Sequence, residues 1–193
     1  MSNSKDWAVF LDRDGTINEE VNYLGDPAHL KLTPDAAKAI YLLNSHNIPV
    51  IVVTNQAGIA RGYFTETQMH LVHQALDLMI AVENAKIDAY YFCPHHPTAG
   101  IGDYKMTCTC RKPHPGMLYQ AAQDLQLDLS KSYLVGDKLT DIQAGNLAGC
   151  QTILVETGYG KEESKTQQDE TKPDQISPNL LSAIQWILTQ SNS

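Results

Sequence analysis

Two aspartates lie two residues apart, directly after a short apolar run near the start of the chain. They are Asp12 and Asp14, within the stretch FLDRDGTIN at 10–18. Such a pair alone is weak evidence of chemistry, because two carboxylates after a strand can also form a solvated turn or cap a helix. Asp137 changes this interpretation. It ends a second apolar run, in LVGDKLTDI, and can share one cation with Asp12.

This set of residues suits the transfer of a phosphoryl group. Mg²⁺ prefers oxygen ligands, so two carboxylates, a backbone carbonyl and a phosphate oxygen would hold it. The cation and Lys112 would offset the repulsion between a phosphate dianion and an attacking carboxylate, while Thr54 would fix the phosphate oxygens. Asp12 could then attack in line to give an aspartyl phosphate. Asp14 could protonate the leaving alcohol and later deprotonate the hydrolytic water.

Short apolar runs alternate with helical patterns along the chain. The runs predict buried strands at 7–11, 48–53, 87–92, 132–136 and 151–155, and the patterns predict helices at 34–46, 65–83, 115–126, 139–148 and 178–189. This alternation predicts an α/β protein with a doubly wound parallel sheet covered on both faces. Ligands of such sheets bind beyond the carboxyl ends of the strands, where Asp12, Thr54, Cys93 and Asp137 stand.

The length of 193 residues predicts a single domain, 1–193. No large insertion interrupts the chain between the first predicted strand and Thr54, so we expect no separate cap domain. The segment 161–174 is almost free of apolar residues and predicts a polar surface connection before the last helix.

A loop at 93–110 combines thiols and imidazoles at metal-binding spacing. Its sequence, CPHHPTAGIGDYKMTCTC, would supply four ligands to a tetrahedral, structural zinc ion: Cys93, Cys108, Cys110 and either His95 or His96. The alternative is a loop with free thiols and a solvated histidine. Because the loop has few apolar residues, the ion would replace a missing core and hold Arg111 and Lys112 in position. The remaining histidines are expected at the surface: His29, His46, His70, His73 and His114.

Charge and composition restrict the partners and the compartment. The formal net charge of −8 opposes general binding to nucleic acid or to an anionic membrane. A small anionic substrate would need local positive charge, for which the candidates are Arg13, Arg61, Lys105, Arg111, Lys112 and Lys138. The start of the chain has no signal-peptide pattern, and clustered cysteines without one favour metal binding in a reducing compartment. We expect a cytoplasmic monomer.

Four segments together resemble the haloacid dehalogenase superfamily: FLDRDGTIN, VVTNQAGIARG at 52–62, CRKPHPGM at 110–117 and VGDKLTDI at 135–142. The resemblance spans 7–155 and implies a phosphatase with Asp12 as nucleophile and Asp14 as general acid and base. It also implies that Thr54 and Lys112 stabilise the phosphate, that Asp12, Asp137 and the backbone carbonyl of Asp14 bind Mg²⁺, and that His95 rather than His96 binds zinc. Asp141 stays open between binding at the edge of the site and a cap or supporting role.

Within that superfamily the chain resembles the heptose bisphosphate phosphatases. The related histidinol-phosphatases have a shorter zinc loop than this chain, whose zinc loop is 93–110, and an arginine where this chain has Lys138. The resemblance implies a small phosphorylated sugar as substrate, contacted by Glu20, Val21, Asn22, Tyr23, Thr54, Asn55, Gln56, Ala57, Arg111, Lys112 and Lys138. Intact Asp12 and Asp14 argue against an inactive phosphate-binding regulator. The lack of a large cap, which would shield a phospho-enzyme from water, argues against a phosphomutase.

Overall fold

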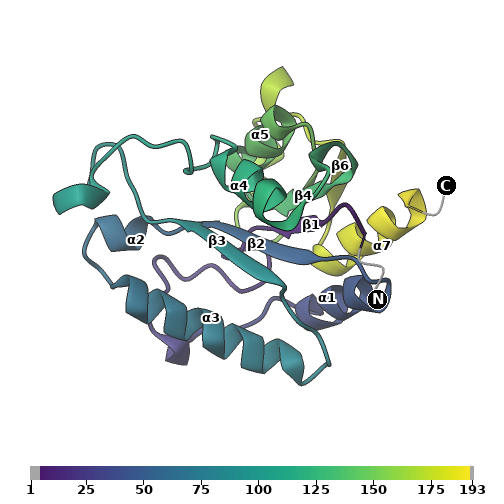
Figure 1. Cartoon of the computed structure of the whole chain (residues 1–193), viewed down its shortest axis with the longest axis horizontal. Coiled ribbons are helices and arrows are strands. Elements are labelled where there is room, and N and C mark those ends of the chain that lie inside the picture. Colours follow the sequence, from purple (N-terminus) through teal and green to yellow (C-terminus); the bar gives the residue numbers. More distant parts are fainter. Residues whose placement is uncertain (1–4, 192–193) are drawn as a thin grey trace.

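A single six-stranded sheet forms the centre of the molecule (Figure 1). The computed structural model describes residues 5–191. Its strands are β1 (Val9–Leu11), β2 (Val50–Asn55), β3 (Ala89–Cys93), β4 (Tyr133–Gly136), β5 (Gln151–Val155) and β6 (Gln175–Ser177). They lie in the order β3-β2-β1-β4-β5-β6, and all neighbouring pairs are parallel. The predicted parallel α/β fold is confirmed.

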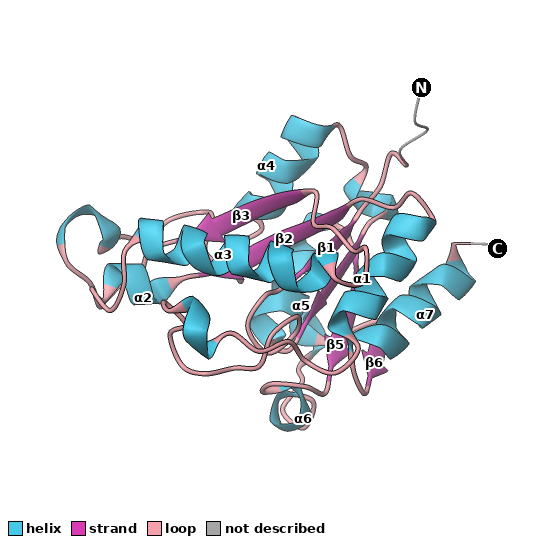
Figure 2. Ribbon diagram, turned by 90° about the horizontal axis from the view of Figure 1, so that it is seen from below, coloured by secondary structure: helices cyan, strands magenta, loops and turns pink. Residues whose placement is uncertain are grey.

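Helices cover both faces of this sheet. They are α1 (Ala36–Ser45), α2 (Ala57–Ala60), α3 (Glu66–Ala81), α4 (Gly116–Leu125), α5 (Leu139–Ala148), α6 (Gly160–Glu163) and α7 (Leu180–Gln190). Helices α1, α3 and α7 lie on one face, in front of the strands in Figure 2, and α4 and α5 lie on the other. In the described part of the chain, four short 3-10 turns complete the connections, at Pro27–His29, Gly102–Tyr104, Leu129–Lys131 and Asp169–Thr171. Within residues 5–191, no helix has both the length and the hydrophobicity needed to cross a bilayer.

Alternate residues of β1 pack into the two helical layers. Val9 and Leu11 belong to the cluster shared with α1, α3 and α7, whereas Phe10 belongs to the cluster shared with α4 and α5. A strand buried on both faces is apolar at every position, so it reads as a continuous apolar run. For this reason the apolar runs in the sequence correctly predicted the first five strands.

The strand order reverses between β1 and β4. From β1 the chain proceeds outward through β2 and β3, and from β4 it proceeds the opposite way through β5 and β6. The crevice at such a reversal is the usual ligand site of an open parallel sheet. Asp12 and Asp137 follow the two strands that flank the reversal, and the backbone N–H of Asp12 donates to the carbonyl of Val135 at 2.9 Å.

One strand of the fold was not expected from the sequence. The edge strand β6 was not predicted, because its three residues QIS contain no apolar run. The polar connection at 161–174 contains part of α6 and a 3-10 turn, and it is tied back to the sheet. The carboxylate of Asp174 accepts from the backbone N–H of Thr152 at 2.7 Å. In residues 5–191 no cap domain separates the strands.

Candidate active site

Lys112 is buried at the switch point, which is the crevice between β1 and β4 where the strand order reverses. All three of its ammonium hydrogens have an acceptor. Its Nζ lies 2.8 Å from Oδ1 of Asp12, 2.6 Å from Oδ1 of Asp141 and 2.6 Å from the carbonyl oxygen of Val53. Burial alone would lower the pKa of Lys112, but the negative charges of Asp12 and Asp141 outweigh it and raise that pKa. The ammonium group therefore stays charged and is held in one position.

Three buried carboxylates surround a common centre beside Lys112. One oxygen from each of Asp12, Asp137 and Asp141 lies within 4.8 Å of the others. Burial, and then the negative charge of the neighbouring carboxylates, raise the pKa of Asp137 to about 8. Burial likewise raises the pKa of Asp12 to about 6, against the opposing charge of Lys112. Oδ1 of Asp137 is buried and has no hydrogen-bond partner among residues 5–191. A hard divalent cation such as Mg²⁺ fits this set of oxygen atoms.

Glycine makes room for Asp137. A Cβ atom on Gly15 or on Gly158 would collide with Oδ2 of Asp137, and both glycines have positive φ, at 86° and 53°. The same oxygen accepts from the backbone N–H of Tyr159 at 2.9 Å. Two loops, one after β1 and one after β5, therefore fix the orientation of this carboxylate.

Asp141 makes two contacts within the site. Its Oδ2 accepts from the backbone N–H of Lys138 at 3.1 Å, at the start of α5, and its Oδ1 pairs with Lys112. The carboxylate thus caps a helix and holds the buried ammonium group at the same time. It also belongs to the group of three carboxylates that could hold a cation.

Asp14 is held away from the carboxylate trio by Arg13. Arg13 Nη2 donates to Oδ2 of Asp14 at 2.9 Å, Asn18 Nδ2 donates to Oδ1 at 3.0 Å, and Gln56 Nε2 donates to Oδ2 at 2.9 Å. Burial opposes ionisation, but the charge of Arg13 and these hydrogen bonds outweigh it and lower the pKa of Asp14. Arg13 is completely buried. The sequence left Arg13 open between a substrate contact and a surface charge. Its side chain is buried and is outside the lining of the pocket, and it pairs with Asp14 instead.

The end of β2 supplies polar groups on the other side of Asp12. Gln56 Nε2 donates to the hydroxyl oxygen of Thr54 at 2.8 Å, which leaves the hydroxyl hydrogen of Thr54 available to another acceptor. Asn55 exchanges two hydrogen bonds with the backbone of Lys112, at 3.0 and 3.1 Å. The side chain of Asn55 therefore fixes Lys112 against β2.

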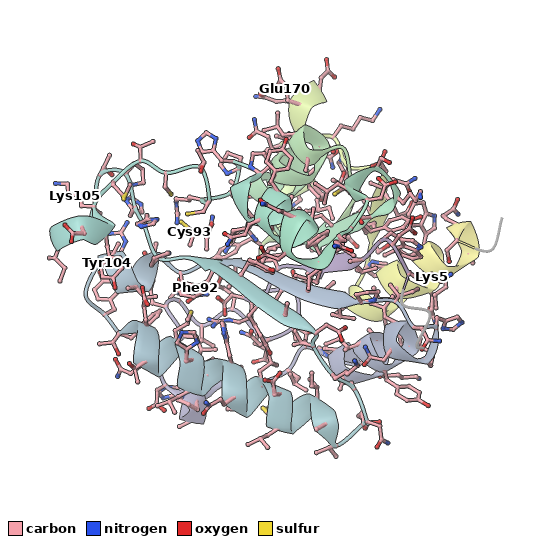
Figure 3. The ribbon with its side chains drawn as sticks, viewed as in Figure 1. Lys5, Phe92, Cys93, Tyr104, Lys105 and Glu170 are labelled. Carbon is pink, nitrogen blue, oxygen red and sulfur yellow. The ribbon has the colours of Figure 1, made fainter. Side chains whose placement is uncertain are left out.

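These groups open into a pocket of about 340 Å³. It is lined by Asp12, Asp14, Glu20, Asn22, Tyr23, Thr54, Asn55, Gln56, Ala57, Gly58, Arg61, His96, Arg111, Lys112, Lys138, Thr140, Asp141 and Tyr159. Every residue predicted to contact substrate is in this lining except Val21, which lines a neighbouring hollow. Asp137 is fully buried and is not in the lining of the pocket. Lys105 is outside the lining, on the outer part of the loop that follows Cys93 (Figure 3).

Lys138 contacts two other residues that line the pocket. Its Nζ lies 3.1 Å from a carboxylate oxygen of Glu20 and 4.7 Å from the centre of the Tyr159 ring. Tyr159 was not predicted as a site residue. Its position could have indicated it, because it stands four residues after β5, in the loop that begins at Glu156.

The thiols and one imidazole of the 93–110 loop come together at the end of β3. Sγ of Cys110 lies 3.1 Å from Sγ of Cys93, 3.3 Å from Sγ of Cys108 and 3.4 Å from Nδ1 of His95. All four ligand atoms lie within 4.8 Å of one another, and none of these cysteines is in a disulfide. Neighbouring thiols at this spacing suit a tetrahedral zinc ion. His96 is not in the group.

One histidine expected at the surface is buried. His73 is on the side of α3 that faces β3, and it is 4 % exposed. Its ring stacks on that of Tyr90, with 4.3 Å between the ring centres. Burial lowers the pKa of His73 to about 3, so the ring is neutral. His73 shares the buried side of α3 with Val72 and Leu76, so a polar residue at a buried position of a helix was missed by the sequence-based prediction.

Comparisons with known proteins identify the class. Residues 109–183 match the family model described as HAD-hydrolase-like. A curated relative from Thermosynechococcus vestitus, named D-glycero-D-manno-heptose-1,7-bisphosphate 7-phosphatase, is 43 % identical over 94 % of this chain and 95 % of its own length. A second relative, from Escherichia coli K12, is named D-glycero-beta-D-manno-heptose-1,7-bisphosphate 7-phosphatase. It is 40 % identical over 94 % of this chain and 87 % of its own length.

A solved structure extends the likeness to the backbone. The D,D-heptose 1,7-bisphosphate phosphatase of B. bronchiseptica, complexed with magnesium and phosphate, superposes with a TM-score of 0.85 at 31 % identity. The match covers 95 % of this chain and 99 % of that one. The chain is a haloacid dehalogenase-like hydrolase. Within that class it belongs to the family of heptose bisphosphate phosphatases.

Proposed function

We propose that this protein removes the 7-phosphate of D-glycero-D-manno-heptose 1,7-bisphosphate, on the way to a nucleotide-activated heptose. The observation that carries the proposal is the buried group of Asp12, Asp137 and Lys112 at the switch point, below a pocket whose lining includes the predicted substrate contacts. Relatives that share about two fifths of the sequence are named for this reaction. A histidinol-phosphatase has no comparable support.

In the first proposed step a carboxylate oxygen of Asp12 attacks phosphorus. A bond forms between that oxygen and phosphorus, the bond from phosphorus to the sugar oxygen breaks, and the leaving oxygen takes a proton from Asp14. Although burial opposes ionisation, the charge of Arg13, which donates to Asp14, lowers the pKa of Asp14 and favours its ionised form before substrate binds. An arriving phosphate dianion raises the pKa of a nearby carboxyl, which favours the protonated form that this step needs.

In the second step the roles of Asp14 reverse. It accepts a proton from a water molecule whose oxygen attacks the aspartyl phosphate, and the bond between Asp12 and phosphorus breaks to release inorganic phosphate. The ammonium group of Lys112, fixed 2.8 Å from Asp12, offsets the charge gathered on the phosphoryl oxygens in both steps. The free hydroxyl hydrogen of Thr54 suits one of those oxygens.

Two metal ions belong to the proposal. Mg²⁺ would be held by Asp12, Asp137 and the backbone carbonyl of Asp14, and when bound it would supply positive charge that offsets the negative charge of the phosphoryl group. The unpartnered Oδ1 of Asp137 supports this assignment. Zn²⁺ would be held by Cys93, His95, Cys108 and Cys110, leaves no open position, and is structural. Cytoplasmic, reducing conditions would keep these thiols available.

A steady-state screen tests the function. The purified protein, with Mg²⁺ added, is assayed with heptose 1,7-bisphosphate, histidinol phosphate, fructose 1,6-bisphosphate and simple sugar monophosphates. We expect kcat/KM for the heptose bisphosphate to exceed all others by at least about tenfold, which corresponds to about 1.4 kcal/mol of transition-state binding. A higher value for histidinol phosphate, or no turnover of any substrate, would overturn the proposal.

A further inference from the structure

Two arginines at the outer part of the pocket have no carboxylate partner within residues 5–191. Arg61 follows α2 and Arg111 follows the zinc-binding Cys110, and both line the pocket. Neither forms an ion pair with an acidic side chain of the described chain, although the protein carries a formal net charge of −8. The guanidinium carbon of Arg61 lies 5.8 Å from the centre of the Tyr23 ring. Positive charge at this point is therefore left for an anion that comes from outside the chain.

His96 adds a third donor to the same part of the pocket. Its Nδ1 accepts from the backbone N–H of Ala99 at 2.9 Å and from that of Thr98 at 3.3 Å. A ring nitrogen that accepts carries no hydrogen, so the hydrogen of the neutral ring is on Nε2. Nε2 of His96 lies 3.4 Å from Nη2 of Arg61. With this tautomer both atoms carry hydrogens and neither can accept from the other, so one external acceptor could bind both N–H groups.

Backbone contacts hold this pair of donors together. The N–H of Ile101, in the zinc loop, donates to the carbonyl of Ala60 at 2.9 Å, which joins the loop to the end of α2 just before Arg61. The N–H of His96 donates to the carbonyl of Tyr104 at 3.0 Å, across the loop. Arg111 Nη1 donates to the carbonyl of His95 at 3.2 Å. The zinc loop thus sets the positions of both His96 and Arg111.

We propose that His96 and Arg61, together with Arg111, form the subsite for the phosphate that is not cleaved, and that His96 is a specificity-determining donor. This inference rests on the proposed function and deepens it. Three donor groups face a phosphate monoester that has three terminal oxygens, and guanidinium forks suit such oxygens. His96 lies outside the cluster of thiols and lines the pocket, whereas its neighbour His95 belongs to the cluster.

The test compares two substrates that differ only in the distal phosphate. Wild type, Arg61→Met and His96→Phe are assayed with heptose 1,7-bisphosphate and with heptose 7-phosphate. Lys105→Met is the matched control, because it removes a positive charge from the same loop outside the pocket. We expect the ratio of kcat/KM, bisphosphate over monophosphate, to fall about tenfold or more in both pocket variants, as for the loss of a hydrogen bond to a charged group. We expect Lys105→Met to stay within about twofold of wild type.

A fourth variant separates recognition from loop structure. His96→Gln keeps an N–H donor that can reach the pocket, so it should recover the ratio to within about threefold of wild type. Zinc content and melting temperature are measured for every variant. An unchanged ratio in both Arg61→Met and His96→Phe overturns the subsite, as does a ratio that falls only in preparations that have lost zinc.

Failure of the subsite and failure of the proposed function give different results. If the wild type does not cleave the heptose bisphosphate, the proposed function fails, and the ratio is measured instead with fructose 1,6-bisphosphate against fructose 6-phosphate. A wild type that shows no preference for the bisphosphate in either pair overturns the subsite. A preference that the pocket variants lose supports it, whichever sugar is turned over.

Discussion

The ammonium group of Lys112 donates a hydrogen bond of 2.8 Å to Oδ1 of Asp12, from a position one hundred residues later in the chain. Both side chains are buried, and Asp141 holds the other side of the ammonium group. The proposed nucleophile and the positive charge that would offset the phosphate are therefore one preformed unit. A preorganised charge of this kind needs no rearrangement when the phosphoryl group arrives.

The first prediction concerns Asp12→Asn. The amide has nearly the same volume but is a poor nucleophile, so kcat should fall by about four orders of magnitude or more, as expected for the loss of covalent catalysis. The fold should be retained, and in the absence of Mg²⁺ the melting temperature should stay level or rise, because one of three crowded carboxylates is removed. Asp103→Asn, at an exposed aspartate, is the control. A variant free of deamidated protein that keeps a tenth of the wild-type kcat would contradict the assignment.

The second prediction concerns pH and Mg²⁺. The folded state raises the pKa of Asp12 to about 6 and that of Asp137 to about 8, from an ordinary value of 3.8. The folded, metal-free protein therefore binds these protons more tightly than the unfolded chain does. The stability that this gives is complete below about pH 4 and is lost as the pH rises through 6 and 8. Between pH 6 and pH 9 the metal-free protein should lose several degrees of melting temperature, because about 1 kcal/mol corresponds to roughly 2–4 °C at this size.

Bound Mg²⁺ should remove most of this loss, since it neutralises the ionised carboxylates. Scanning calorimetry at pH 6 and pH 9, with and without Mg²⁺, measures the effect. We expect the increase in melting temperature on adding Mg²⁺ to be larger at pH 9. An equal increase at both pH values, or a variant Asp137→Asn with the same pH dependence as wild type, would count against the site.

The sequence predicted the parts of this site that depend on strand ends. Asp12, Thr54 and Asp137 follow apolar runs, and the parallel sheet brings such positions together at one edge. It did not predict contacts that depend on backbone direction. The burial of Arg13 beneath Asp14 is one of these, since a charged residue between two aspartates gives no sign of which way it points.

The donors at the outer pocket were hidden for a similar reason. The orientation of His96 depends on two backbone N–H groups within a loop that has no repeating pattern. Its proximity to Arg61 depends on a contact between segments 35 residues apart. The edge strand β6 was also missed, because three residues with a single apolar side chain carry no periodic signal.

The third prediction is that the protein binds about one zinc ion per chain and that Cys108→Ser loses it. Serine is a poor zinc ligand, so zinc content and melting temperature should fall together. The matched control is Cys150→Ser, at a buried cysteine outside the cluster, which should keep zinc even if stability drops. Elemental analysis and calorimetry decide the matter. Normal zinc content with an unchanged melting temperature in Cys108→Ser would refute the assignment.

The fourth prediction concerns the glycine that faces Asp137. In Gly158→Ala the new methyl group would collide with Oδ2 of Asp137 and with the backbone Cα of Gly15, so both the carboxylate and the loop after β1 must shift. We expect the concentration of Mg²⁺ needed for half-maximal activity to rise about tenfold or more, with a smaller loss of kcat at saturating Mg²⁺. Gly149→Ala is the control, because Gly149 also has positive φ, at 82°, but a Cβ there meets no atom of the described chain within 4 Å. Equal Mg²⁺ requirements in the two variants would show that backbone strain alone is responsible.

The last prediction concerns Arg111, whose Nη1 donates to the carbonyl of His95 while its other donors remain available to the pocket. If it binds the phosphate that is not cleaved, Arg111→Ala should reduce kcat/KM for the bisphosphate by about 1–3 kcal/mol of transition-state binding. The corresponding monophosphate should lose much less, so the ratio between the two substrates is the quantity to measure. If Arg111 only braces the zinc loop, both substrates lose activity by the same factor and zinc binds more weakly. An unchanged preference for the bisphosphate in Arg111→Ala would therefore remove this residue from substrate recognition, whereas a lost preference with normal zinc content would establish it there.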